Sequence, residues 1–283
     1  MAIGDVRDGG DRLENLEKMI NAVEETQKRG LNRAEHRLHL RCELPHHTTL
    51  PLFEKLVNRE PVSLVSLMDH SPGQRQFANR EKYREYYQGK YSLTDAQMRE
   101  YEEEQLALAA RWSQPNRTAI AGMCRERQIA LASHDDATHD HVVESHLLGS
   151  VIAEFPTTFE AAESSRRHGM NVLMGAPNIV RGGSHSGNVA AHQLASLGLL
   201  DILSSDYYPA SLLDAAFRVA DDENNAFTLA QAINLVTQNP ARALNLHDRG
   251  VIAEGKRADL VLAHRKGEHI HIDHVWRQGK RVF

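Results

Sequence analysis

The sequence lacks the features that mark several broad classes of protein. It contains only two cysteines, Cys42 and Cys124, which cannot form a disulfide scaffold and favour a reducing compartment, so we expect a cytoplasmic protein. No apolar run is long enough to cross a bilayer, and the first residues lack the basic start and apolar stretch of a secretion signal. Lysine and arginine number 33 against 38 acidic residues, a net charge of −5. This balance provides no broad basic surface, and we expect neither nucleic acid nor membrane as a partner.

Histidine is abundant instead, with 17 among 283 residues, in a chain of otherwise ordinary globular composition. Short apolar runs alternate with stretches that have the spacing of amphipathic helices, as in residues 12–29. The runs cover residues 37–44, 62–69, 129–133, 150–155, 170–176 and 199–205. Strands that alternate with helices indicate a parallel sheet, which is either a (β/α)₈ barrel or a doubly wound open sheet.

Polar residues at the ends of these runs distinguish the two folds. Each run leads into a carboxylate, an imidazole or a glycine-rich loop, and a barrel collects such groups at the carboxyl ends of nearly all its strands. An open sheet would gather them at one switch point. We therefore predict a barrel domain over residues 1–248, with a polar helical insertion at 75–117. Residues 249–283 contain short alternating runs between glycines and predict a small antiparallel β domain.

Carboxylates and imidazoles that converge from several strands can bind a divalent cation. The candidate ligands stand at the run ends and are Glu43, His70, His134, Glu154 and Asp206. This mixture of donors suits Zn better than Ca or Mg, with Mn or Fe as alternatives, and one or two ions are expected. A metal would lower the pKa of water and supply hydroxide near neutral pH. Asp206, alone after the last run, is the candidate general base.

The segment RGGSHSGN at residues 181–188 predicts a binding site for phosphate. Its glycines allow backbone N–H groups to approach an anion, and the helix expected after it presents its positive end. The candidate substrate-binding residues are Arg181, Gly182, Gly183, Ser184 and His185. A plain glycine-rich turn is the alternative. Four basic residues of the insertion could reach the same substrate, but we expect most of them to be solvated: Arg75, Arg80, Lys82 and Arg84.

The C-terminal segment NPARALNLHDRGVIAEGKRADLVLAH resembles the closing signature of the amidohydrolase superfamily. The resemblance implies a metal-binding barrel followed by part of a small β-sandwich. It implies that Asp206 matches the metal-binding aspartate of the last strand and that His134 matches the histidine of strand five. Glu43 is similar to a bridging carboxylate found in some members, and Glu154 stands where many members have a histidine.

Six further segments resemble the metal-dependent diphosphatases of the carbon–phosphorus lyase pathway: HLRCELPH, LMDHSPGQRQF, ASHDDATH, EFPTTFEAA, MGAPNIVRGGSHSGN and LSSDYYP. The resemblance implies hydrolysis of a phosphoanhydride bond in a ribose 5-triphosphate that carries a 1-phosphonate, with release of pyrophosphate. These relatives carry a His-x-Asp metal motif on their first strand, and no such motif precedes Glu43. The expectation is thus an N-terminally truncated barrel that lacks its first strand or strands.

Two other functions stay open at this point. The same barrel could hydrolyse an amide or a nucleobase, because the fold does not choose the chemistry. Alternatively, a truncated barrel could be non-catalytic. The expected partner is a small phosphorylated sugar, and a homo-oligomer is left open.

Overall fold

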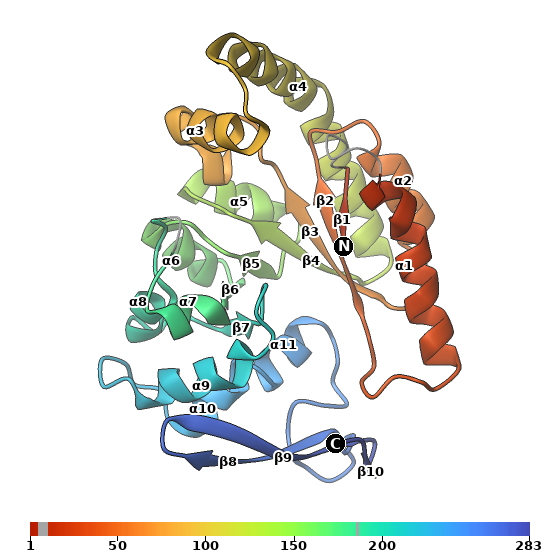
Figure 1. Cartoon of the computed structure of the whole chain (residues 1–283), viewed down its shortest axis with the longest axis vertical. Coiled ribbons are helices and arrows are strands. Elements are labelled where there is room, and N and C mark those ends of the chain that lie inside the picture. The colour runs from red at the N-terminus through yellow and green to blue at the C-terminus, as the bar shows by residue number, and fades with distance from the viewer. Residues whose placement is uncertain (5–10, 185–186) are drawn as a thin grey trace.

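The computed structural model (Figure 1) describes residues 1–4, 11–184 and 187–283. Its main sheet has seven strands in chain order, and every neighbouring pair is parallel. The strands are β1 (Ala2–Ile3), β2 (Leu38–Glu43), β3 (Val62–Met68), β4 (Ala130–His134), β5 (Ile152–Glu154), β6 (Asn171–Gly175) and β7 (Ile202–Ser204). A doubly wound sheet would reverse its order at a switch point, so the strand order confirms the predicted barrel type. Within the described residues the sheet is a curled half-barrel, because no pairing joins β7 to β1.

Helices follow most strands and cover the outside of the curl (Figure 1). They are α1 (Asp11–Lys28), α2 (Thr49–Leu56), α5 (His139–Leu147), α6 (Phe159–Arg167), α7 (Ala176–Arg181), α8 (Ala191–Ser196), α9 (Ser211–Asp221), α10 (Leu229–Asn234) and α11 (Gln238–Ala243). Threonine caps fix where two of them begin, since Thr138 accepts from the His141 N–H and Thr158 from the Ala161 N–H. Both caps stand a few residues after a strand, so the loops at the strand ends are short.

Two apolar clusters hold the helices on the sheet. In the first half of the chain Leu16 and Ile20 of α1 pack with Leu40 of β2 and Val65 of β3. In the second half Val172 and Leu203, from β6 and β7, pack with Leu194 of α8 and Val219 of α9. These side chains are almost completely buried. Burial of this kind stabilises each strand–helix unit by roughly 1.5–3 kcal/mol per large apolar side chain.

The insertion contains η1 (Arg75–Phe77), α3 (Arg80–Tyr91) and α4 (Asp95–Glu126), and it differs from the prediction in two respects. First, α4 continues through Pro115 to Glu126, beyond residue 117, where the polar insertion was expected to end. Its last turns bury Ile120 and Cys124 against the sheet, so packing maintains the helix despite the hydrogen bond that proline removes. Second, the insertion has an aromatic core of its own, formed by Phe77, Tyr83, Met98 and Tyr101.

The C-terminal segment forms the expected separate antiparallel sheet, in the order β10-β9-β8. Its strands are β8 (Leu260–Lys266), β9 (His269–Arg277) and β10 (Lys280–Arg281). The sheet lies beside α9, where Arg265 pairs with Asp221 at 2.7 Å (Figure 1). It also reaches the loop after α1, because Arg277 Nη1 donates to the Asn32 carbonyl at 2.8 Å. In the described residues we find no helix with the length and apolar character needed to cross a membrane.

Gly250 allows a close approach where the chain leaves α11. Its φ is +90°, and a Cβ there would lie 2.9 Å from the Gln238 Cα and 3.0 Å from the Ala241 Cβ. We predict that Gly250→Ala lowers the free energy of unfolding by about 2–4 kcal/mol, because the left-handed backbone costs about 1–2 kcal/mol and the clash with backbone adds to it. Urea unfolding followed by circular dichroism measures the loss.

Gly255 provides the matched control, since its φ is +76° and a Cβ there would meet nothing within 4 Å. Gly255→Ala should lose only the backbone part, about 1–2 kcal/mol. Equal losses in the two variants would show that the packing around Gly250 does not contribute.

Candidate active site

Three side chains meet at the carboxyl ends of β3 and β4 and could hold a metal ion. They are His70, His134 and Asp135, and their possible ligand atoms all lie within 4.8 Å of one another. Asp135 Oδ2 is 3.7 Å from His70 Nε2 and 3.5 Å from His134 Nε2. Donors about 2.1 Å from a tetrahedral metal lie about 3.4 Å apart, so the two distances from Asp135 are close to those around one zinc-sized ion.

A carboxylate behind each imidazole directs it toward Asp135. Glu154 Oε2 accepts from His134 Nδ1 at 2.8 Å, and Glu43 Oε2 contacts His70 Nδ1 at 2.6 Å. With Nδ1 of each ring bonded to its glutamate, Nε2 of each ring lies on the Asp135 side. Metal-binding histidines commonly have this arrangement, in which the second carboxylate sets the tautomer and the ring orientation.

The electrostatics of these pairs agree with that arrangement. Burial alone would raise the pKa of Glu154, but the neighbouring His134 and a hydrogen bond from the Ser66 hydroxyl lower it to about 2. Burial would lower the pKa of His70, yet the carboxylates of Glu43 and Asp135 outweigh it and raise the pKa to about 10. In the absence of a metal, protonated His70 balances these carboxylates, and a bound cation would take the place of its Nε2 proton.

The structure brings together four of the predicted metal ligands, but only the two histidines belong to the cluster that could hold an ion. His70 and His134 face each other with ring centroids 5.8 Å apart. Glu43 and Glu154 contact the far nitrogens of these rings, and direct metal ligation by either carboxylate stays a prediction. Asp135 was not among the predicted ligands, although it follows His134 directly at the end of its run. Its position after a strand-end histidine was the available signal.

A cavity of about 370 Å³ opens beside these residues. It extends from the ends of β2, β3 and β4 to those of β6 and β7. The residues that line it include Arg41, His70, His134, Asp135, Gly175, Arg181, Gly183, Ser184, Asn188 and Asp206. The predicted general base, Asp206, thus shares a cavity with the histidines. Gly175 leaves room for it, because a Cβ at residue 175 would lie 3.3 Å from Asp206 Oδ2.

The predicted phosphate loop is only partly as expected. Arg181 ends α7, a helix that the sequence analysis missed, and Gly182 caps that helix with a φ of +81°. Arg181, Gly183 and Ser184 line the cavity, whereas Gly182 lines a separate hollow beside His192. His185 lies outside the described residues. The helix expected after the loop is present as α8 but begins only at Ala191, so the loop leaves α7 rather than entering a helix directly.

Backbone conformation at the strand ends is unusual for residues other than glycine. Asp135, Phe155 and Asp206 have φ values of +57°, +56° and +48°. Such left-handed residues cost about 1–3 kcal/mol each and persist only where the surrounding structure enforces them. All three follow strands of the barrel sheet, and all three line the cavity. The strain is consistent with a site that holds its side chains in place before a ligand arrives.

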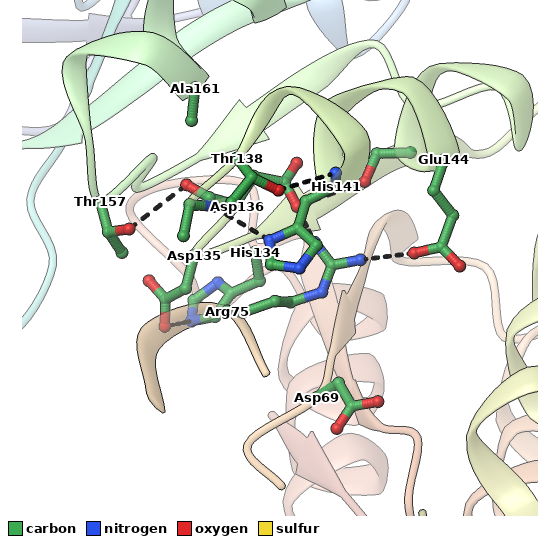
Figure 2. Close-up of polar contacts among 12 residues, drawn as sticks. Asp69, Arg75, His134, Asp135, Asp136, Thr138, His141, Glu144, Thr157 and Ala161 are labelled. Atoms are coloured by element: carbon green, nitrogen blue, oxygen red, sulfur yellow. Dashed lines mark hydrogen bonds and ion pairs between the residues drawn. The ribbon is translucent and has the colours of Figure 1, made fainter. Parts of the chain in front are cut away.

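A buried ion-pair network supports this edge of the sheet from the insertion side (Figure 2). Arg75 is 2% exposed and contacts the Asp136 carboxylate, which is 1% exposed. Its Nη2 also donates to Glu144 of α5 at 3.1 Å. Among the arginines expected to be solvated, Arg75 is therefore an exception. Asp136 follows the candidate ligand Asp135, so Arg75 fixes the loop from which Asp135 projects.

Arg117 of α4 extends the same network to β3. It donates to Glu144 at 2.5 Å through Nη1 and to Asp69 at 3.4 Å through Nη2. Asp69 precedes His70 in the chain. Both strand-end loops that supply the candidate ligands are therefore held by arginines of the insertion, and the insertion has a structural role in the site.

Comparisons with known proteins show the family to which the chain belongs. Residues 18–283 match the model of the amidohydrolase family. The alpha-D-ribose 1-methylphosphonate 5-triphosphate diphosphatase of Escherichia coli (strain K12) is 88% identical over all 283 residues, which correspond to 75% of that protein. An uncharacterized metal-dependent hydrolase from Pyrococcus furiosus has a similar fold, with a TM-score of 0.52 and 14% identity over 85% of this chain and 53% of that one. Helicobacter pylori aminofutalosine deaminase has a TM-score of 0.47 and 11% sequence identity, over 95% of this chain and 80% of that one.

The buried network generates a stability prediction. We expect Arg75→Met to lower the free energy of unfolding by about 3–5 kcal/mol, because it leaves Asp136 as an uncompensated buried charge. Arg167→Met is the control, since Arg167 forms an exposed pair with Glu163 on α6 and should contribute less than about 1 kcal/mol. Chemical denaturation of both variants measures the difference. A loss below about 1 kcal/mol for Arg75→Met would contradict a structural role for the network.

Proposed function

The chain belongs to the amidohydrolase family, and we propose that it hydrolyses alpha-D-ribose 1-methylphosphonate 5-triphosphate to the 5-phosphate and pyrophosphate. One observation carries the proposal: the 88% identity, over the entire chain, to the diphosphatase that bears this name. In the proposed reaction, water attacks the phosphorus next to the ribose and pyrophosphate leaves. The reaction would form part of phosphonate breakdown.

A divalent metal fits the candidate site, and we propose zinc. The donors are His70, His134 and Asp135, and imidazoles combined with a carboxylate at tetrahedral spacing suit Zn, with Mn or Fe as alternatives. These three residues account for one ion. Such a metal supplies a nucleophile at neutral pH by lowering the pKa of water. Glu43 and Glu154 would maintain the two imidazoles in the tautomer that binds it.

The remaining residues of the cavity have roles that phosphoryl transfer requires. Asp206 takes the proton of the attacking water, because its carboxylate lines the cavity that also holds the two histidines. Arg181 and the adjoining Gly183 and Ser184 bind phosphate oxygens through side-chain or backbone donors. Phosphoryl transfer depends mainly on such positioning and on charge stabilisation, since little covalent chemistry falls to the protein.

The proposed substrate is a small phosphorylated sugar, and a cavity of about 370 Å³ lies within the usual range for such ligands. We further propose that the protein works in the cytoplasm. Cys42 and Cys124 are both free and buried, as expected in a reducing compartment.

The general-base role of Asp206 generates a kinetic prediction. Asp206→Asn should lower the rate of pyrophosphate release by about 10²–10⁴-fold, because the amide cannot accept the proton of the attacking water. The variant should retain its fold, measured by circular dichroism. Asp140→Asn, at an exposed position in the first turn of α5, is the control and should keep the parent rate. A rate within a few-fold of the parent for Asp206→Asn would remove it from the mechanism.

The metal assignment generates a second prediction. His134→Ala should lower the metal bound per chain, since it removes one of three donors, and the rate of hydrolysis should fall with it. Elemental analysis of the purified protein measures the metal content and identifies the ion. His146→Ala, on the exposed side of α5, should leave the metal content unchanged. Full metal occupancy in His134→Ala would show that His134 is not a ligand.

A further inference from the structure

Arg41 projects from β2 into the cavity that holds the candidate metal ligands. Its Nη2 donates to His134 Nε2 at 3.1 Å, and its Nε is buried with no hydrogen-bond partner among the described residues. Across residues 1–4, 11–184 and 187–283, no carboxylate forms an ion pair with its guanidinium. A fixed cation with an unused donor thus lines the site. The run RLHLRCEL gave no reason to single out this arginine.

The contact with His134 determines what kind of ligand the cavity can accept. Nε2 of His134 has one lone pair, which Arg41 now uses, and a metal bound to His134 would need the same lone pair. The guanidinium is always charged, so metal and arginine would then face each other as two cations. An anionic group between them would reduce that repulsion and satisfy the freed N–H donors. A phosphoryl oxygen that contacts both the metal and Arg41 meets this requirement.

Neighbouring groups leave Arg41 available for this anion. Glu154 is occupied by His134 and by the Ser66 hydroxyl, which donates to Glu154 Oε2 at 2.7 Å. Burial lowers the pKa of His39 on the same strand to about 4, so this histidine is neutral at pH 7 and adds no second positive charge. Arg181 also lines the cavity, where its Nη1 donates to the Tyr207 hydroxyl at 3.0 Å. Arg41 of β2 and Arg181 of α7 thus border the same space.

We propose that Arg41 is a catalytic residue that binds a non-bridging oxygen of the phosphoryl group under attack. The inference rests on the proposed function and names the group that the arginine holds. In the reaction, a P–O bond forms from water and the anhydride P–O bond to pyrophosphate breaks. The proton of the water passes to Asp206, and Arg41 stays protonated throughout. Its planar guanidinium can offer two N–H groups to phosphoryl oxygens, which an ammonium group cannot match.

Binding of ribose 5-phosphate tests this role directly, because that molecule carries the phosphoryl group in the form left after hydrolysis. Calorimetric titration should be done on metal-free and metal-loaded protein, for the parent, Arg41→Gln and Arg41→Lys. We expect Arg41→Gln to weaken binding by about 10- to 100-fold, the size of a lost charge-assisted hydrogen bond, with Arg41→Lys in between. kcat/KM should fall at least as much, while metal content and the unfolding midpoint stay at the parent values.

Arg37→Gln is the matched control, since Arg37 precedes the same strand but pairs with Glu35 outside the cavity. It should bind ribose 5-phosphate as the parent does. Parent-like binding and kcat/KM in Arg41→Gln would overturn the inference and leave the proposed function standing. Loss of metal in Arg41→Gln with unchanged binding of ribose 5-phosphate would also overturn it. The arginine would then only position His134 for the metal and would not bind the phosphoryl group. If Arg41→Gln unfolds, the weaker binding expected of Arg41→Lys decides the matter.

A separate outcome concerns the proposed function itself. If the metal-loaded parent releases no pyrophosphate but its binding of ribose 5-phosphate still depends on Arg41, the diphosphatase proposal fails while the phosphate-binding role of Arg41 is supported.

Discussion

The hydrogen bond between His134 and Glu154 is the interaction on which the candidate site depends. It joins two neighbouring strands, β4 and β5, and the Ser66 hydroxyl on β3 donates to the same carboxylate. Because Glu154 is buried and its pKa is lowered to about 2, the carboxylate is charged at all physiological pH values. It therefore maintains the His134 proton on Nδ1, and Nε2 becomes the acceptor that faces the cavity. The contact of Arg41 with His134 depends on that acceptor.

Charge in this region is arranged in two layers with different functions. The inner layer contains imidazoles, carboxylates and Arg41 around a cavity, where each group has a side open to a ligand. The outer layer consists of the buried Arg75, Arg117, Asp69 and Asp136 together with the partly exposed Glu144, and it connects the insertion to the loops after β3 and β4. Buried ion pairs of this kind seldom add much stability over apolar packing, but breaking one is costly. The outer layer is thus better explained by the positions it imposes on Asp135 and His70 than by the stability it adds.

The proposed reaction requires few groups of the protein. Phosphoryl transfer needs a nucleophile, an acceptor for its proton and positive charge near the phosphoryl oxygens. Strand ends of a parallel sheet bring such groups together from distant parts of the sequence, here from residues 41 to 206. The left-handed backbone at Asp135 and Asp206 aims these side chains at a cost that the surrounding packing offsets.

The order of the strands, and the polar residues at their ends, could be predicted from the sequence alone. Apolar runs with polar residues at one end predict a parallel barrel whose site lies at that end, and the structure has this arrangement for His70, His134 and Asp206. Which side chain faces the cavity was decided only by tertiary structure. Glu43 and Glu154 contact the backs of imidazoles and Asp135 faces them, because these contacts depend on pairing between strands and not on distance along the chain. The two arginines Arg41 and Arg75 were also beyond prediction. The sequence did not single out Arg41, and it gave no sign that Arg75 would be buried, because the surroundings of a charged side chain depend on the fold.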